Sequence, residues 1–175
     1  MLAYSTYDSP IGKLKIVVKD DRLFQLQLMP TSKTMQNSEP FEDQLEDPII
    51  QATKNWLDAY FAGQNPPLDL KLEFNGTDYQ IAVWNALLEI PYGQIVSYQD
   101  LANRLKVLLG RDNVSARGVG QAVKRNPIAI YVPCHRVIGS NHQLVGYFYG
   151  LEIKKYLLEL EGVSVENKSQ KTAFK

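Results

Sequence analysis

The sequence predicts a mixed α/β (α+β) protein in which a small N-terminal antiparallel-sheet domain with one helix precedes a mainly helical C-terminal domain. The first thirty residues contain short apolar runs separated by turn residues, a pattern typical of an antiparallel meander. Capped helical patterns follow from residue 47 onward. With 175 residues, 45% of them hydrophobic, the chain is long enough for two small, tightly packed domains. We expect these at 1–74 and 75–162, with a polar tail at 163–175.

The N-terminal domain is predicted to begin with three strands. Turn residues at 9–12 and 20–21 separate the apolar runs. Together they predict an antiparallel meander with strands at 2–7, 13–19 and 22–28.

One helix is expected to complete this domain. The preceding segment, 31–47, is polar and acidic and lacks periodicity, so we interpret it as a surface loop. Asp47 as N-cap and Pro48 at the first helical position predict a helix that Gly63 ends. A short strand at 68–72 is expected to connect it to the second domain.

The C-terminal domain is predicted to begin with three helices. A capping box of Thr77 and Gln80 begins a helix through Ile90, and the same start signal begins a shorter helix over 97–105. A third helix is expected over 115–124. The second and third helices are candidates for a helix-turn-helix, although helical hairpins that pack on their own core are commoner.

Basic residues are concentrated in one part of a chain whose formal net charge is zero. Between residues 101 and 140 there are seven basic residues and a single acidic one, Asp112. Such a stretch favours either a solvated surface or a face that binds nucleic-acid phosphates. The basic residues are Arg104, Lys106, Arg111, Arg117, Lys124, Arg125 and Arg136.

The single cysteine, Cys134, follows an apolar run at 128–132 that predicts a buried strand. A lone cysteine is commonly a small buried hydrophobe. His135 and Arg136, however, place two potential cations beside this thiol, which favours a nucleophile. A Cys-His hydrolase is a competing class, but it needs an oxyanion hole and an orienting residue that Asn126 supplies only in part.

Small residues are unusually frequent in the predicted helix at 115–124. Each glycine there costs about 1 kcal/mol relative to alanine, which indicates that something approaches the helix closely. Tight packing against another helix and insertion into a narrow DNA groove explain this pattern equally well. In the second case Arg117 is the long cation that projects into the base stack.

The residues around the cysteine resemble the signature of a known family. The segment 133–137, preceded by Asn126 and Pro127, is similar to that of the methylated-DNA-protein-cysteine methyltransferases, also called O6-alkylguanine-DNA alkyltransferases. The segment 8–12 is similar to part of the family's smaller domain, so the resemblance covers nearly the whole chain. Further matching positions are 76–80, 83–84, 90–93, 97–98, 117, 119–120, 150, 154, 157–158 and 161.

The resemblance implies roles for individual residues. Cys134 is expected to accept the alkyl group, His135 to act as its base through a water, and Glu161 to orient that histidine. Asn126 is expected to brace the active-site turn, and Tyr98 to press the flanking phosphate and offer its hydroxyl to the departing guanine. The residues expected to bind DNA or substrate are Arg117, Ser115, Ala116, Gly118, Gln99, Arg136, Val137, Tyr147, Phe148 and Tyr149.

The resemblance also implies direct repair of double-stranded DNA that contains O6-alkylguanine, with O4-alkylthymine as a second candidate substrate. The alkyl group, mainly methyl, is expected to pass once and irreversibly to the cysteine, with no cofactor. Arg117, on a minor-groove helix, is expected to hold the gap left by the flipped base. One cysteine and two histidines do not supply the usual four zinc ligands, so no metal is expected. We expect a cytoplasmic monomer without a signal peptide, membrane span or required protein partner.

Two departures from the family pattern give further expectations. The stretch 103–114 is several residues longer than expected and lacks the usual proline. An enlarged turn there is expected to bring Arg104, Lys106 and Arg111 to additional phosphates. Tyr149 stands where many members have glycine, and it is expected to narrow the alkyl pocket against benzyl groups.

Two other functions fit part of the pattern. Alkyltransferase-like proteins bind lesions and flag them for other repair machinery, but they replace the acceptor cysteine, which is present here as Cys134. A thiol hydrolase turns over many times and ignores DNA, whereas an alkyltransferase stops after one equivalent.

Overall fold

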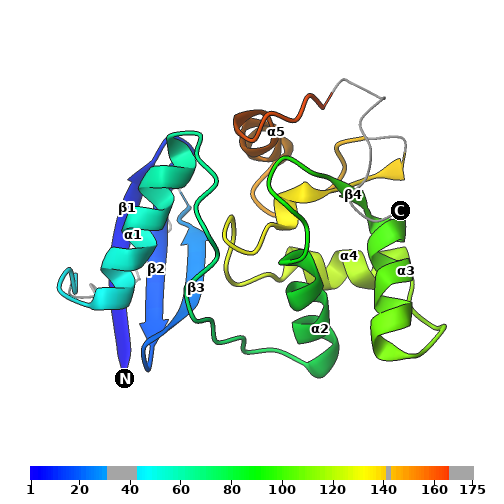
Figure 1. Cartoon of the computed structure of the whole chain (residues 1–175), viewed down its shortest axis with the longest axis horizontal. Helices are drawn as coiled ribbons and strands as arrows, with labels where there is room; N and C mark the ends of the chain where they lie inside the picture. The colour runs from blue at the N-terminus through cyan, green and yellow to red at the C-terminus, as the bar shows by residue number, and fades with distance from the viewer. Residues whose placement is uncertain (31–42, 141–142, 166–175) are drawn as a thin grey trace. The chain divides into compact units, whose positions relative to one another are not determined.

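The computed structural model describes residues 1–30, 43–140 and 143–165, and the chain forms two compact units (Figure 1). Unit 1 comprises Met1–Asn75 and Pro127–Tyr131, and unit 2 comprises Gly76–Asn126 and Val132–Lys175. The fold class that the sequence predicts, a mixed α/β protein with an N-terminal antiparallel sheet and a mainly helical remainder, is confirmed.

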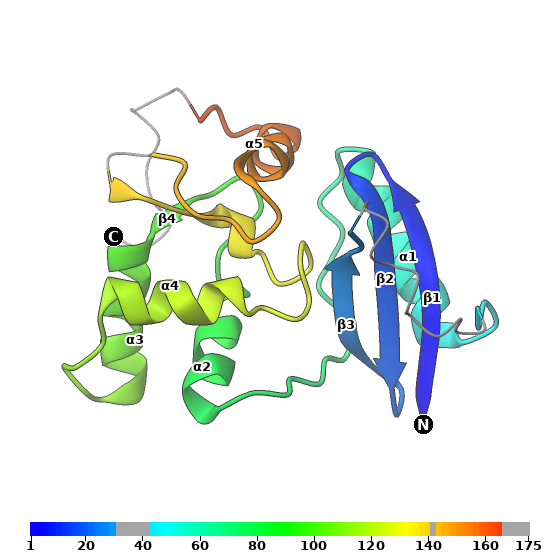
Figure 2. The same cartoon turned by 180° about the vertical axis from the view of Figure 1, so that it is seen from behind.

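Unit 1 contains a three-stranded antiparallel sheet in the order β1-β2-β3. One face of this sheet is covered by α1 (Pro48–Phe61), as both views show (Figures 1 and 2). Asp47 is the N-cap, and its carboxylate accepts the backbone protons of Ile49 and Ile50, as its place before Pro48 predicts. The three predicted strands are confirmed as β1 (Leu2–Ser9), β2 (Gly12–Lys19) and β3 (Arg22–Leu28).

Two further strands predicted for the chain are wrong in their extent. The strand expected at 68–72 is reduced to one bridge between Leu72 and Leu23, and the strand expected at 128–132 to one bridge between Ile128 and Leu26. Ile130 adopts a φ of 72°, which turns the chain away from β3 and ends the pairing. The apolar run at 128–132 is buried, as expected, but it is a buried turn.

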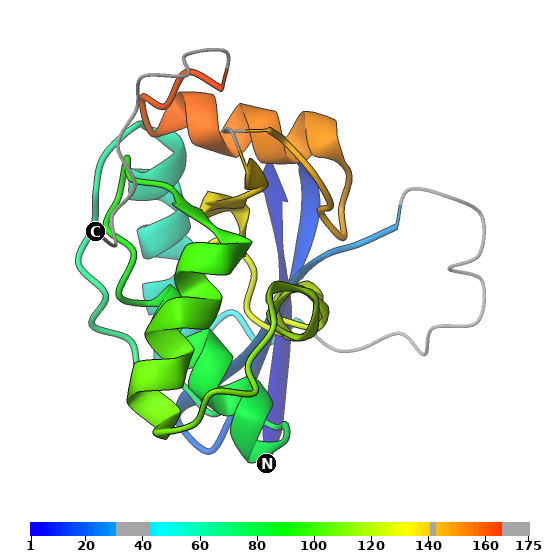
Figure 3. The same ribbon diagram turned by 90° about the vertical axis from the view of Figure 1, so that its right-hand side faces the viewer.

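The described residues of unit 2 form four α-helices, a short 3₁₀ turn and a two-stranded parallel sheet. Trp84 donates from Nε1 to the carbonyl oxygen of Ala122 (2.9 Å), which joins α2 to α4 inside the core. Figures 1 and 3 show that α4 runs steeply across α3, which is the arrangement of a helix-turn-helix. The elements are α2 (Asp78–Leu87), β4 (Val96–Ser97), α3 (Tyr98–Leu109), α4 (Ala116–Lys124), η2 (Cys134–Arg136), β5 (Val137–Ile138) and α5 (Leu151–Leu160).

The predicted helix starts are confirmed, but two predicted ends are wrong. The helix α2 ends at Leu87 and not at Ile90. Capping boxes begin α2 at Thr77 and α3 at Ser97, and Ser115 is the N-cap of α4. The helix α3 continues past Leu105 to Leu109, since the intervening residues form helix readily and Gly110 ends it in the left-handed conformation. Residues 103–109 of the stretch 103–114 are therefore helix, and residues 110–115 connect α3 to α4.

The packed core of unit 2 extends into the predicted tail. Val163 is buried with Ile95, Ile138 and Leu158. Residues 166–175 of that tail, and residues 31–42 of the predicted loop, lie outside the described residues. Within the described ranges, no helix combines the length and apolar character needed to cross a membrane.

Candidate active site

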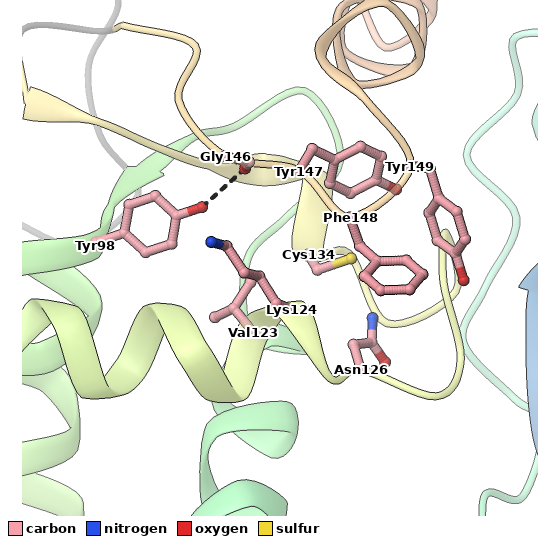
Figure 4. Close-up of a pocket in the computed structure, with 9 residues that line it drawn as sticks. All are labelled: Tyr98, Val123, Lys124, Asn126, Cys134, Gly146, Tyr147, Phe148 and Tyr149. Atoms are coloured by element: carbon pink, nitrogen blue, oxygen red, sulfur yellow. Dashed lines mark hydrogen bonds between the residues drawn. The ribbon is translucent and has the colours of Figure 1, made fainter.

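The thiol of Cys134 lies at the start of the 3₁₀ turn η2 and is buried, with 5% of the residue exposed. Because this segment is a turn and not a strand, the side chains of Cys134 and His135 are not forced onto opposite faces. The thiol lines a pocket of unit 2 (Figure 4). The other residues that line it are Tyr98, Val123, Lys124, Asn126, Gly146, Tyr147, Phe148 and Tyr149.

Asn126 connects the end of α4 to the turn that carries the thiol. Its Nδ2 donates to the carbonyl oxygen of Val132 (2.8 Å), and its side chain also hydrogen-bonds Cys134. Burial raises the pKa of the Cys134 thiol, although hydrogen bonds from Asn126 and Tyr147 and the charge of Lys154 lower it in part. The resting thiol is therefore protonated and needs a base to become a nucleophile.

His135 is fully buried and faces a carboxylate. Its Nε2 lies 2.5 Å from Oε2 of Glu161, the C-cap of α5. The other oxygen of Glu161, Oε1, accepts from Nε of Arg136 (2.7 Å) and from the backbone of Gly93 (3.1 Å). The 3₁₀ turn, α5 and the 90–93 turn thus meet at one carboxylate.

The ionisation states of this cluster follow from burial and charge together. Burial by itself raises the pKa of Glu161, but His135 and Arg136 outweigh that effect and hold the pKa well below its usual range. Burial lowers the pKa of His135, which outweighs the opposite effect of Glu161. At neutral pH the carboxylate is ionised and the imidazole is neutral, so Glu161 keeps the imidazole proton on Nε2.

Two residues expected to bind DNA or substrate are instead internal. Val137 is buried in β5, and Arg136 is 7% exposed with its guanidinium committed to Glu161 and to the carbonyl oxygen of Ile90 (2.6 Å). Both side chains are therefore largely hidden from solvent. Arg104, expected to reach a phosphate, pairs with Glu89 (3.1 Å).

Four more of the predicted DNA-binding residues lie on α4 or at its N-cap. Ser115 and Arg117 are exposed, and Ala116 and Gly118 are half-buried. A β-carbon at Gly118 would lie 3.2 Å from the N-cap hydroxyl of Ser115, which is a tight contact. One at Gly120 would make only ordinary contact, 3.6 Å from the ring of Tyr98. Packing therefore accounts for part of the small-residue pattern.

The loop that closes the pocket is attached to both α3 and α5. The Tyr98 hydroxyl donates to the carbonyl oxygen of Gly146 (3.2 Å), a bond drawn in Figure 4. Lys154 of α5 is fully buried, and its ammonium donates to the carbonyl oxygens of Val137, Val145 and Gly146. Burial raises the pKa of Tyr98 to about 12 and lowers that of Lys154 to about 8.

Lys154 was absent from the predicted site residues. Its sequence signal is a lysine three and four residues before Leu157 and Leu158, on the apolar face of α5. Gln99, which was among the predicted residues, is exposed on α3 and donates to Asn103 (3.0 Å). It does not line the pocket.

Three consecutive aromatic residues border the thiol. Tyr149 contacts Tyr147 and Phe148 edge to face, at ring-centroid distances of 5.7 and 5.0 Å. Phe148 is 71% exposed. Figure 4 shows all three rings on the side of the pocket that Cys134 faces.

Comparison with known proteins assigns both parts of the chain to one family. Residues 78–163 match the DNA-binding domain of 6-O-methylguanine DNA methyltransferase, and residues 2–74 match its ribonuclease-like domain. The chain is 42% identical over 159 residues to a methylated-DNA-protein-cysteine methyltransferase of Methanosarcina acetivorans, covering 91% of this chain and 97% of that protein. It is 40% identical over 171 residues to the constitutive enzyme of Bacillus subtilis, covering 94% and 98%.

A solved structure agrees with these sequence matches. The crystal structure of Mycobacterium tuberculosis OGT in complex with DNA is similar to this chain with a TM-score of 0.77 and 40% identity. The match covers 98% of this chain and 96% of that one. The helical arrangement described above therefore occurs in a protein solved with DNA.

Proposed function

The chain belongs to the methylated-DNA-protein-cysteine methyltransferase family, and we propose that it repairs DNA by taking an alkyl group, mainly methyl, from O6 of guanine onto Cys134. The observation that carries this proposal is a buried, pocket-lining thiol next to a histidine that contacts an ionised carboxylate. O4-alkylthymine is a second candidate substrate.

The first step is removal of the thiol proton. Because Glu161 holds the proton on Nε2 of His135, the Nδ1 lone pair accepts the Cys134 proton through a water. Asn126 and Tyr147 donate hydrogen bonds that stabilise the thiolate against its burial. Asn126 also braces the turn through Val132.

The second step transfers the alkyl group. The thiolate attacks the alkyl carbon, the carbon–O6 bond breaks, and its electron pair stays with guanine. Tyr98 donates its hydroxyl proton to guanine, and the proton that the thiol lost then returns Tyr98 to its neutral form. A neutral base and a thioether remain. The thioether does not revert, so each molecule acts once.

The target base must leave the duplex, because O6 is inaccessible within stacked DNA. We place α4 in the minor groove, where the small outer face of Ala116 and Gly118 fits and where exposed Arg117 fills the gap in the stack. Because the minor groove distinguishes base pairs poorly, we expect little sequence preference.

The extended α3 supports one further DNA contact. Arg111 follows Gly110, is exposed, and lies over the ring of Tyr79 at 5.4 Å, so its position is partly fixed. Arg104 is already paired with Glu89. Of the basic residues expected to reach phosphates from this stretch, Arg111 is the best placed.

We further propose that the protein works as a cytoplasmic monomer with no cofactor, metal or required protein partner. Each alkyl transfer consumes one protein molecule, so the chemistry above involves the DNA and this chain. Double-stranded DNA with O6-alkylguanine is the proposed partner.

Intact mass spectrometry after incubation with a duplex oligonucleotide containing O6-methylguanine tests this function. We expect a single gain of one methylene group, absent with Cys134→Ala and absent with undamaged DNA. Tight binding to the lesion without a mass gain would instead indicate a recognition protein, and repeated turnover of an ester without DNA would indicate a thiol hydrolase.

A further inference from the structure

Arg136 has an internal environment that its position next to the thiol does not by itself explain. Its guanidinium is buried and makes hydrogen bonds to the Glu161 carboxylate (2.7 Å) and to the Ile90 carbonyl oxygen (2.6 Å). It lies over the ring of Tyr92 at 5.8 Å. Burying a guanidinium costs free energy unless a partner compensates its charge, and here the Glu161 carboxylate is that partner.

The two oxygens of Glu161 have different partners. Oε1 accepts hydrogen bonds from Nε of Arg136 and from the backbone N–H of Gly93, whereas Oε2 faces Nε2 of His135. Bonds on Oε1 fix the plane of the carboxylate and so direct Oε2 at the imidazole. The guanidinium of Arg136 lies at hydrogen-bond distance from this carboxylate.

Building on the proposed alkyl transfer, we propose that Arg136 is a positioning residue that acts through Glu161. By neutralising and orienting the carboxylate, Arg136 lets Glu161 hold the proton on Nε2 of His135, which leaves the Nδ1 lone pair to accept the thiol proton. This assigns Arg136 to proton transfer and not to contact with DNA.

The charge of Arg136 matters because the alternative state of Glu161 reverses the imidazole. A buried carboxyl without a compensating cation tends to be protonated. A protonated Glu161 would donate to Nε2 of His135, and the imidazole proton would then sit on Nδ1, the wrong atom for accepting a proton from Cys134.

Other groups near the pair do not replace this charge. Tyr92, from the 90–93 turn, faces Glu161 as a neutral phenol whose pKa burial raises. Lys154 of α5 acts on His135, where its charge lowers the pKa of the imidazole. The groups that lower the pKa of Glu161 are His135 and Arg136.

The test is the pH dependence of single-turnover methyl transfer for wild type, Arg136→Gln and Arg136→Lys. For Arg136→Gln we expect the acid limb of the rate profile to move up by about one pH unit or more, with a loss of about tenfold at low pH that recovers as Glu161 ionises. Arg136→Lys keeps the charge and is expected to keep the limb near its wild-type position. Binding of lesion DNA is expected to stay unchanged in both variants.

Val137→Ala is the matched control, because it perturbs the adjacent buried position without changing charge. It is expected to leave the acid limb in place even if it lowers stability. As a readout independent of activity, ¹⁵N NMR of His135 is expected to show the proton on Nε2 in wild type and a shift toward Nδ1 in Arg136→Gln.

The outcomes separate this inference from the proposed function. If wild type transfers no methyl group, the proposed function fails. If wild type transfers it but Arg136→Gln keeps the wild-type limb and tautomer, the role of Arg136 is wrong. If Arg136→Gln does not fold, Arg136→Lys decides, since an upward shift of its limb despite the retained charge would also overturn the inference.

Discussion

The Tyr98 hydroxyl and the carbonyl oxygen of Gly146 lie 3.2 Å apart, and the Lys154 ammonium donates to the same oxygen. One backbone oxygen therefore joins α3, α5 and the loop that closes the pocket. Since burial raises the pKa of Tyr98 to about 12, its hydroxyl remains a proton donor throughout the neutral range.

Tyr98→Phe is expected to slow methyl transfer by about a hundredfold, because departing guanine loses its proton donor. Tyr156→Phe is the matched control, since that side chain is exposed on α5 and does not line the pocket. Rapid-quench kinetics on methylated duplex measures both. A Tyr98→Phe rate equal to that of wild type would show that this hydroxyl is not the proton donor to guanine.

Arg117→Ala is expected to reduce repair of duplex DNA by about tenfold or more while leaving repair of a single-stranded oligonucleotide unchanged. The reason is that no gap has to be filled where the base is already unstacked. Arg125→Ala, also exposed but at the other end of α4, provides the comparison. A matching loss on single strands would contradict the gap-filling role.

Arg111→Ala is expected to reduce the slope of log K against log salt for DNA binding by about one, as removal of one phosphate contact requires. Arg104→Ala should leave the slope unchanged because Glu89 already pairs with that side chain. Fluorescence anisotropy over a salt series distinguishes the two. Identical slopes for Arg111→Ala and wild type would show that the extended α3 adds no contact.

Wild type is expected to react normally with O6-methylguanine and poorly with free O6-benzylguanine, because Tyr149 fills space beside the thiol. Tyr149→Gly should increase the benzyl rate by about tenfold or more and leave the methyl rate within about twofold. Mass spectrometry after timed reactions measures both rates. A fast benzyl reaction in wild type would remove the steric explanation.

Lys154 makes stability depend on alkaline pH. Its folded pKa is about 8 against an ordinary value of 10.5, so between these values the unfolded chain binds more protons and stability rises with pH. Lys154→Met should lack this gain, which amounts to up to about 3 kcal/mol. Lys155→Met, exposed on the same helix, is the control.

Urea unfolding at pH 8 and pH 10 measures how the free energy of unfolding changes with pH in each protein. The effect of Lys154 is the difference in this change between wild type and Lys154→Met. The difference is needed because the raised pKa of Cys134 acts in the opposite direction, since the unfolded thiol loses its proton first. If the free energy of unfolding changes with pH equally in wild type and Lys154→Met, the buried ammonium keeps its proton at pH 10.

Local signals in the sequence predicted the helix starts and the meander well. Asp47, Thr77 and Ser97 cap helices as expected, because each side chain accepts a backbone proton within its own first turn. Such short-range hydrogen bonds are visible in the residue order alone.

Features set by distant contacts were predicted less well. The run at 128–132 has strand composition, yet it pairs with β3 at one residue because Ile130 turns the chain. Arg136 was expected to bind DNA or substrate, whereas the partners of its guanidinium, Glu161 and Ile90, are far away in sequence. Burial of that kind leaves no periodic trace at the residue itself.

The chain passes from one unit to the other three times, at 75–76, 126–127 and 131–132. A fragment of residues 76–175 would therefore carry Ile128 and Tyr131 without the β3 and α1 residues, Leu26 and Trp56, that they contact in the whole chain. Such a truncation would expose the two side chains, which lie between Asn126 and Cys134 in the sequence, to solvent. Genetic dissection of this protein into an N-terminal and a C-terminal half should accordingly yield pieces that aggregate or misfold unless the 127–131 segment is redesigned.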